Sequence, residues 1–349
     1  MSTVGIIVNP HAGKDIRRLV SAAGHTSDAT KIGIMRRVAA GAIEQGAQRV
    51  LMSTDTHQLA ERAVEGLGGI IEFVDSPLTS SHLDTVAAAA AMWKQLVDVV
   101  VVLGGDGTCR DVATGWPEVP LIAISTGTNN VFPSNVDGTT AGVAAALVAT
   151  GVVPFDVVCR PSKRIAVEVN DPAQHTIVNE SALVEAALIE TAFVGARAVS
   201  DPASIRWVVA CIANPSSTGL ASIAGRIHPV SRDEACGVVI RLGAGTGHRR
   251  VRVPLAPGTF STLTIDSVEP LALSTPVTLP GGGVLALDGE RTLPVSAGAS
   301  LTVSIGQSGP RLIDVDTTLA LAARDRRFDL TPSAPVGTGA PLRKAHHGD

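Results

Sequence analysis

Residues 99–108 read Val-Val-Val-Val-Leu-Gly-Gly-Asp-Gly-Thr, and this stretch decides the fold. Apolar side chains stand at every position from Val99 to Leu103, which is typical of a strand covered on both faces in a parallel sheet. Gly104 and Gly105 follow at once, and there the backbone can turn tightly because no Cβ obstructs it. The stretch therefore predicts a buried central strand that ends in a Gly-rich loop.

The segments around this strand alternate between strand-like and helix-like patterns. The predicted strands are residues 4–8, 49–52, 70–74, 99–103 and 121–124. The predicted helices are residues 30–45, 57–65, 81–95 and 140–149. Because strands and helices alternate, we expect an α/β domain over residues 1–150, built on a doubly wound parallel sheet with right-handed crossovers.

The pattern changes from about residue 152. Helical periods nearly vanish, and short apolar runs are separated by Gly and Pro, which is typical of β-rich structure. The predicted strands in this part are residues 165–169, 207–212, 238–242 and 301–305. The pattern predicts a second, β-rich domain over residues 151–330. Residues 331–349 combine Pro, Gly and Ser with a charged end, so we expect a disordered tail.

Composition excludes several classes of protein. The net charge is -4 and the pI is about 6.1, with no dense cluster of Lys and Arg, so no nucleic-acid partner is expected. No apolar run approaches the roughly 18 residues that a membrane span needs, and the N-terminus lacks a basic flank, which predicts a cytoplasmic protein without a span. The 4 cysteines are too scattered for a zinc site or an expected disulfide.

The Gly-rich loop has a position suited to phosphate. In an open parallel sheet, ligands bind at the carboxyl ends of the strands, and backbone N–H groups of such a loop can approach phosphate oxygens. Asp106 is the informative residue, because a carboxylate beside phosphates is repelled unless it holds Mg²⁺ or accepts a proton from the attacking hydroxyl. Either role indicates phosphoryl transfer. The alternative is an ordinary Gly-rich turn in which Asp106 caps the next helix.

Spacing excludes two other phosphate motifs. A Walker A loop would need Gly where Val8 stands and Ser or Thr where Asp15 stands, and Gly104–Gly107 does not give a GxGxxG fingerprint. Asn9 and residues 125–130 follow two neighbouring predicted strands, so we expect them on the same rim as the Gly-rich loop. For residues 125–130 a polar turn that caps the following helix is the alternative.

Three motifs together resemble the ATP-NAD kinase and diacylglycerol kinase superfamily. They are Asn9-Pro10-His11-Ala12-Gly13-Lys14, Gly104-Gly105-Asp106-Gly107-Thr108 and Ser125-Thr126-Gly127-Thr128-Asn129-Asn130. Within it, Asn9-Pro10 followed by residues 14–19 resembles the acetoin catabolism protein X branch. The resemblance spans about residues 4–310. It implies an NAD kinase-like fold, ATP as phosphoryl donor, Mg²⁺, NAD as acceptor and a homo-oligomer.

The resemblance also implies which residues form the site. Asp106 matches the catalytic carboxylate and neighbour of Mg²⁺, and Asn179-Glu180 matches the pair that contacts the dinucleotide acceptor. A late Asp-Gly-Glu turn of the family resembles residues 288–290. The binding residues that the resemblance implies are Asn9, Gly104, Gly105, Gly107, Thr108, Gly127, Thr128, Asn129, Asn179, Glu180, Ser217, Thr218 and Gly219.

The chain departs from the family pattern in two places. NAD kinases carry a Tyr after the Ser/Thr/Gly loop, whereas this chain has 0 Tyr, which puts NAD as acceptor in question. Cys109-Arg110-Asp111 also differs, and Arg110 could pair with a phosphate oxygen or with Asp111. Glu180 stands between apolar runs and needs a partner, which Lys163 or Arg164 could supply.

These observations lead to one hypothesis and two alternatives. The leading hypothesis is a two-domain kinase that transfers the phosphoryl group of ATP to a hydroxyl, with NAD as the first acceptor. The first alternative keeps the fold and changes the acceptor to a lipid or another small alcohol. The second is a non-catalytic nucleotide-binding regulator linked to acetoin catabolism.

Overall fold

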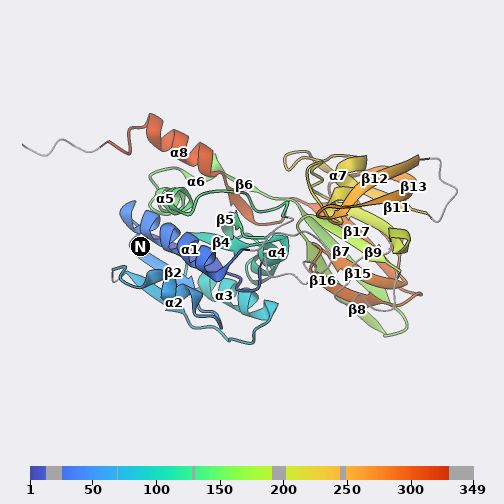
Figure 1. Ribbon diagram of the computed structural model, residues 1–349, viewed down its shortest axis with the longest axis horizontal. Helices are drawn as coiled ribbons and strands as arrows, with labels where there is room; N and C mark the ends of the chain where they lie inside the picture. The colour runs from blue at the N-terminus through green and yellow to red at the C-terminus, as the bar shows by residue number, and fades with distance from the viewer. Residues whose placement is uncertain (13–25, 69, 128–129, 191–201, 244–248, 330–349) are drawn as a thin grey trace, which may run out of the picture.

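The computed structural model describes residues 1–12, 26–68, 70–127, 130–190, 202–243 and 249–329. These residues form two domains that lie side by side along the long axis of the molecule (Figure 1). Helices surround the first domain, whereas the second consists mainly of strands. The predicted fold class, an α/β domain followed by a β-rich domain, is confirmed. The predicted tail, residues 331–349, lies outside the described residues.

A seven-stranded sheet forms the centre of the first domain, in the order β3-β2-β1-β4-β5-β18-β6. Its strands are β1 Thr3–Val8, β2 Arg49–Ser53, β3 Ile71–Val74, β4 Val99–Gly104, β5 Pro120–Ser125, β6 Cys159–Pro161 and β18 Arg311–Ile313. All neighbours run parallel except β6 and β18. Strands β1 and β4 are buried at every position, as the apolar run predicted.

Helices cover both faces of this sheet. They are α1 Asp28–Glu44, α2 Leu59–Val64, α3 His82–Lys94, α4 Asp106–Gly115, α5 Gly138–Ala149, α6 Phe155–Val158 and α8 Val315–Arg324. Along β4, Val99, Val101 and Leu103 pack with α1 and α5, whereas Val100 and Val102 pack with α3 and α4. This alternation follows from the two-residue period of a strand. Among the described helices, none has the length and apolar character that crossing a membrane requires.

The second domain contains two antiparallel sheets. The larger has the order β12-β13-β11-β10-β9-β15-β16, and the smaller has the order β14-β17-β7-β8. Their strands are β7 Arg164–Asp171, β8 Thr176–Ala182, β9 Glu185–Ile189, β10 Ile205–Ala210, β11 Cys236–Leu242, β12 Arg249–Ala256, β13 Thr259–Ala272, β14 Val277–Pro280, β15 Gly283–Leu287, β16 Arg291–Val295 and β17 Ser300–Gly306. Helix α7 Ala221–Ile227 and the 3₁₀ helix Pro202–Ser204 also belong to this part.

After the second domain the chain returns to the first. Strand β18 pairs with β5, placing Leu312 opposite Leu121, and α8 packs against α5. Asp314 caps α8 by accepting a hydrogen bond from Thr317 N at 2.6 Å. The predicted second domain, residues 151–330, therefore needs correction at both ends, because β6, β18 and α8 belong to the first domain. The sequence of such a short strand does not indicate which distant strand it will pair with.

The two crossings between the domains lie next to each other. Ser162 N donates a hydrogen bond to Pro310 O at 2.9 Å, and Gly309 N donates to Ser162 O at 3.0 Å. The outgoing segment after β6 and the returning segment before β18 are therefore hydrogen-bonded to one another at the domain boundary.

Candidate active site

The Gly-rich loop joins β4 to α4 at the carboxyl edge of the first sheet. Gly104 ends β4, Gly105 is the N-cap of α4, and Asp106 is the first residue of the helix. Thr108 Oγ1 accepts hydrogen bonds from Gly105 N at 3.4 Å and from Asn9 Nδ2 at 2.9 Å. The loop after β1 is thus bonded to the Gly-rich loop, as the parallel topology predicted.

The loop after β5 reaches the same edge. Thr126 N donates a hydrogen bond to Gly104 O at 3.1 Å, and Gly127 follows directly. The structure therefore brings Gly127 to the Gly-rich loop. The predicted binding residues Thr128 and Asn129 lie outside the described residues, so their roles stay predictions.

The carboxylate of Asp106 is turned toward the backbone of a neighbouring loop. Its Oδ1 accepts a hydrogen bond from Phe132 N at 2.7 Å, and both oxygens accept from Val131 N at 3.0 and 3.1 Å. Asp106 is only 7% exposed. This placement differs from the expected one, in which the carboxylate faces a nucleotide. The catalytic and metal-binding roles that the resemblance implies for Asp106 remain predictions.

The surroundings of Asp106 disfavour its charged form. Burial, followed by the neighbouring carboxylate of Asp288, raises the pKa of Asp106 from its ordinary value of 3.8 to about 7. The amides of Phe132 and Val131 act in the opposite direction, and Glu290 adds a smaller upward contribution. Asp106 therefore changes its charge near neutral pH.

This shift predicts a pH-dependent contribution of Asp106 to stability. Between pH 3.8 and about 7 the folded protein binds more protons at Asp106 than the unfolded chain does, so the free energy of unfolding falls as pH rises through this window. Asp106→Asn cannot ionise. The free energy of unfolding of the variant minus that of the wild type should therefore rise by at most about 4 kcal/mol from pH 4 to pH 8, as measured by urea unfolding. An equal difference at both pH values would contradict the raised pKa.

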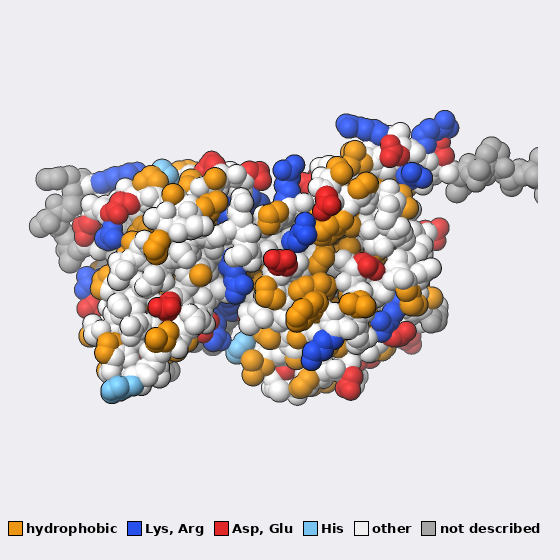
Figure 2. Space-filling view, turned by 180° about the vertical axis from the view of Figure 1, so that it is seen from behind, with side chains coloured by type: hydrophobic (Ala, Val, Ile, Leu, Met, Phe, Trp, Pro, Cys, Tyr) orange, Lys and Arg blue, Asp and Glu red, His pale blue; other side chains and the backbone are white. Residues whose placement is uncertain are grey.

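A cavity of about 360 Å³ lies beside the Gly-rich loop, which is within the usual range of about 300–1,000 Å³ for small-molecule sites. Its walls come from the ends of β1 and β2, the start of α3, one side of α4 and the turn between β15 and β16, so both domains contribute. Figure 2 shows Lys and Arg side chains along the boundary between the domains. The polar side chains that line the cavity include Asn9, His82, Arg110, Asp111, Glu290 and Arg291. Asp106 is not part of the described lining.

Glu290 brings a carboxylate from the second domain onto the Gly-rich loop. A Cβ on Gly107 would lie 2.0 Å from Glu290 Oε2, and one on Gly105 would lie 3.3 Å from Glu290 Oε1. Because Gly105 and Gly107 have no Cβ, the carboxylate of Glu290 can lie directly against the loop. Glu290 is exposed and lines the cavity. It was missing from the predicted binding residues, although the Asp288-Gly289-Glu290 turn marked the segment.

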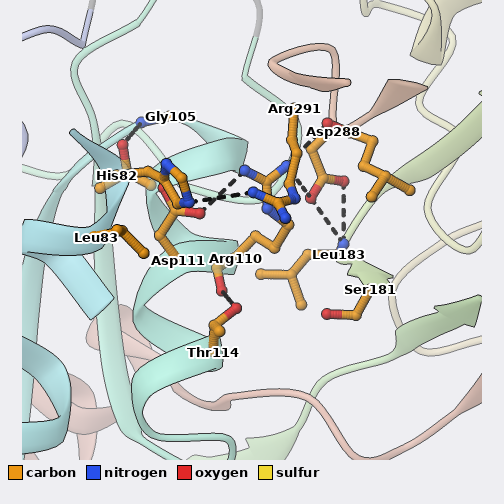
Figure 3. A network of polar contacts seen from close by, with 12 residues as sticks. His82, Leu83, Gly105, Arg110, Asp111, Thr114, Ser181, Leu183, Asp288 and Arg291 are labelled. Atoms are coloured by element: carbon orange, nitrogen blue, oxygen red, sulfur yellow. Dashed lines mark hydrogen bonds and ion pairs between the residues drawn. The ribbon is translucent and has the colours of Figure 1, made fainter. Parts of the chain in front are cut away.

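A buried ionic network links α4 to that same turn (Figure 3). Arg110 donates hydrogen bonds to Asp111 Oδ1 and to Leu287 O, both at 3.0 Å, and its guanidinium lies 3.9 Å from Asp288. The carboxylate of Asp288 accepts hydrogen bonds from Leu183 N at 3.1 Å and from the next amide along the chain. Of the two partners considered for Arg110, the structure shows Asp111.

Arg291 of β16 lines the cavity and contacts residues of β8 and α3. Its Nε donates to Glu180 at 3.0 Å, and its Nη1 lies 3.2 Å from His82 Nε2 (Figure 3). The expected partners of Glu180 were wrong, because Arg291 pairs with it from a strand distant in sequence. Asn179 and Glu180 lie on β8 and face a second hollow, outside the described lining of the 360 Å³ cavity.

Ser217, Thr218 and Gly219 lie between β10 and α7. Ser217 Oγ donates a hydrogen bond to Asn214 O at 2.7 Å, and Gly219 N donates to Pro254 O at 3.0 Å. Both bonds stay inside the second domain. In the described lining of the cavity these three residues do not occur, and their binding roles stay predictions.

Comparisons with known proteins agree with this two-domain arrangement. Residues 4–152 match the ATP-NAD kinase N-terminal domain, and residues 163–308 match the acetoin catabolism protein X C-terminal domain. The crystal structure of yeast NADH kinase complexed with NADH superimposes with a TM-score of 0.52 at 15% identity, covering 97% of this chain and 90% of that one. The fold is therefore NAD kinase-like, and the family match supports a kinase-type function.

Comparison with individual relatives identifies the family within this fold. The acetoin catabolism protein X of Cupriavidus necator is 34% identical over 347 residues, which is 96% of each chain. The chain belongs to the acetoin catabolism protein X family. An uncharacterised protein of Archaeoglobus fulgidus is 37% identical over 132 residues, which is 38% of this chain and 36% of that protein.

Proposed function

We propose that the chain transfers a phosphoryl group from ATP to a hydroxyl group, with NAD or NADH as the first acceptor to test. One observation carries the proposal: a cavity walled by both domains is lined by Arg110 and Asp111 of α4 and by Glu290, whose carboxylate lies against the Gly-rich loop. The match of residues 4–152 to the ATP-NAD kinase N-terminal domain supports it.

The donor phosphates would bind at the Gly-rich loop. Backbone N–H groups at the start of α4 and the positive end of its dipole favour an anion there. Magnesium ions are usually held by one or two carboxylates together with substrate phosphates and water. The described residues contain no group of three or more side chains suited to hold a metal alone, whereas Asp111 lines the cavity and would hold an ion that arrives with the triphosphate. Bound Mg²⁺ would neutralise phosphate charge.

The acceptor hydroxyl would enter the cavity from the side of the second domain and lose its proton to Glu290. Glu290 is exposed and lines the cavity, whereas Asp106 is buried and is not in its described lining. In this proposal Asp106 holds the 131–132 backbone beside the Gly-rich loop. Direct catalysis by Asp106, as the resemblance implies, is tested separately by Asp106→Asn.

The test combines binding and turnover. The full chain is mixed with ATP and Mg²⁺ and offered NAD, NADH, a diacylglycerol or a sphingoid base, and phosphorylated products are measured by mass spectrometry. We expect NADP or NADPH. A phosphorylated lipid instead would favour the lipid-kinase alternative, and calorimetric nucleotide binding without any product would favour the regulator. Absence of both binding and product would overturn the proposal.

A further inference from the structure

The peptide bond between Val131 and Phe132 lies between the side chains of Asp106 and Arg232. On one side, Phe132 N donates a hydrogen bond to Asp106 Oδ1 at 2.7 Å. On the other, the oxygen of the same peptide unit, Val131 O, accepts a short hydrogen bond from the guanidinium of Arg232. Hydrogen bonds in such a chain polarise one another, so each one strengthens the next. A carboxylate and a guanidinium are thus joined through one peptide.

Arg232 reaches this peptide from the second domain. It stands in the segment between α7 and β11, whereas Val131 and Phe132 follow β5 of the first domain. Its guanidinium also donates to Phe132 O and lies 5.4 Å from the centre of the Phe132 ring. Both bonds of Arg232 to the backbone therefore cross the domain boundary.

Lys163 fixes the segment that carries Arg232. Its Nζ donates to the carbonyl oxygens of Ser231, Glu234 and Cys236 at 2.7, 3.0 and 2.9 Å. Lys163 is only 2% exposed, and its buried ammonium group has three carbonyl acceptors for its three N–H donors. Arg232 thus starts from a backbone that is itself held in place.

We infer that Arg232 is a positioning residue that links the second domain to the Gly-rich loop through the Val131–Phe132 peptide. The position of Val131 and Phe132 beside Asp106 then depends on contact with the second domain. Charge-assisted hydrogen bonds are roughly twice as strong as neutral ones, so this link is well suited to transmit the position of the second domain. The benefit to nucleotide binding rests on the proposed function, whereas the bond chain itself does not.

Hydrogen exchange in the ligand-free protein tests the link directly. In Arg232→Gln we expect the amides of Val131 and Phe132 to exchange about tenfold faster than in the wild type, because a charged donor is lost. Arg232→Lys keeps a charged donor and should recover part of this protection. Arg249→Gln is the matched control, since Arg249 also donates to a carbonyl, Ile227 O at 3.3 Å, within its own domain. Unchanged exchange in Arg232→Gln would overturn the inference.

A double-mutant cycle separates positioning from general damage. Each single variant, Arg232→Gln and Asp106→Asn, changes the folding equilibrium constant by some factor. In the double variant, the fall in this constant should be smaller, by about threefold or more, than the product of the two single factors predicts. Arg249→Gln with Asp106→Asn should be multiplicative. A multiplicative result for Arg232 would also overturn the inference. If Arg232→Gln does not fold, Arg232→Lys replaces it in both measurements, with smaller effects in the same direction.

A final measurement connects the link to nucleotide binding. ATP with Mg²⁺ should bind Arg232→Gln about tenfold more weakly than wild type in calorimetry, since loop order must then be established on binding. If the wild type binds no nucleotide, the proposed function fails while the exchange and cycle results still decide the role of Arg232.

Discussion

Glu290→Gln is expected to slow phosphoryl transfer by about 10²–10⁴-fold, because a positioned general base contributes that much to such a reaction. The substitution keeps the size of the side chain and its place against Gly105 and Gly107. It removes the ability to accept a proton from the acceptor hydroxyl. The measurement is kcat at saturating ATP and acceptor, since a loss in kcat with little change in KM indicates an interaction made in the transition state.

The control for this variant is a carboxylate of the same type elsewhere on the surface. Glu269 is exposed on β13 and pairs with Arg241, and neither residue is in the described cavity lining, so Glu269→Gln should leave kcat unchanged. If Glu290→Gln turns over at the wild-type rate, Glu290 is not the proton acceptor. A loss of the same size in Asp106→Asn alone would return that role to Asp106.

Gly107→Ala tests the same carboxylate from the opposite side. The added Cβ would meet Glu290 Oε2 at 2.0 Å and Cδ at 2.7 Å, which belong to the flexible end of that side chain, and would lie 3.1 Å from its Cβ, so the side chain must rotate away. Gly107 lies in the first turn of α4, where Ala is a better helix former than Gly by up to about 1 kcal/mol. We therefore expect nearly wild-type stability with Glu290 displaced and kcat reduced.

Asp288→Ala is expected to lower the free energy of unfolding by about 3–5 kcal/mol, which is typical when one partner of a buried ion pair is removed. The Asp288 side chain is 0% exposed and lies 3.9 Å from the guanidinium of Arg110, itself 5% exposed. Its loss also leaves the amides of Leu183 and Val184 without their acceptor. Urea unfolding monitored by circular dichroism measures the change.

An exposed pair gives the matched comparison for Asp288. Arg326 and Asp329 are 83% and 50% exposed, so Asp329→Ala should change stability by no more than about 0.5 kcal/mol. A cost below about 1 kcal/mol for Asp288→Ala would mean that the network of Arg110, Asp111 and Asp288 contributes little to the contact between the domains.

The first domain could be predicted from the sequence because its signals are local. The apolar run from Val99 to Leu103 predicted β4, and Ser81 predicted the start of α3, where its Oγ indeed accepts a hydrogen bond from Leu83 N at 3.2 Å. The return of the chain through β18 was missed. Arg311–Ile313 is three residues long and gains its identity only by pairing with β5 and β6.

Some features of the candidate site could likewise be predicted from the sequence, whereas others depend on residues that are distant in sequence. Asn9, Gly104 and Thr108 meet because parallel strands bring their carboxyl ends to one edge, which the order of elements already implied. The direction of the Asp106 side chain depends on amides 25 and 26 residues away. The contact of Glu290 with the loop requires the second domain to be placed on the first, and no local pattern specifies that placement.

The paired crossings between the domains limit how the molecule can open. Because Ser162 is bonded to both Gly309 and Pro310, the two connecting segments act as a single narrow hinge rather than as two separate tethers. Rotation of one domain about these paired segments would preserve both hydrogen bonds, whereas sliding one domain past the other would break them.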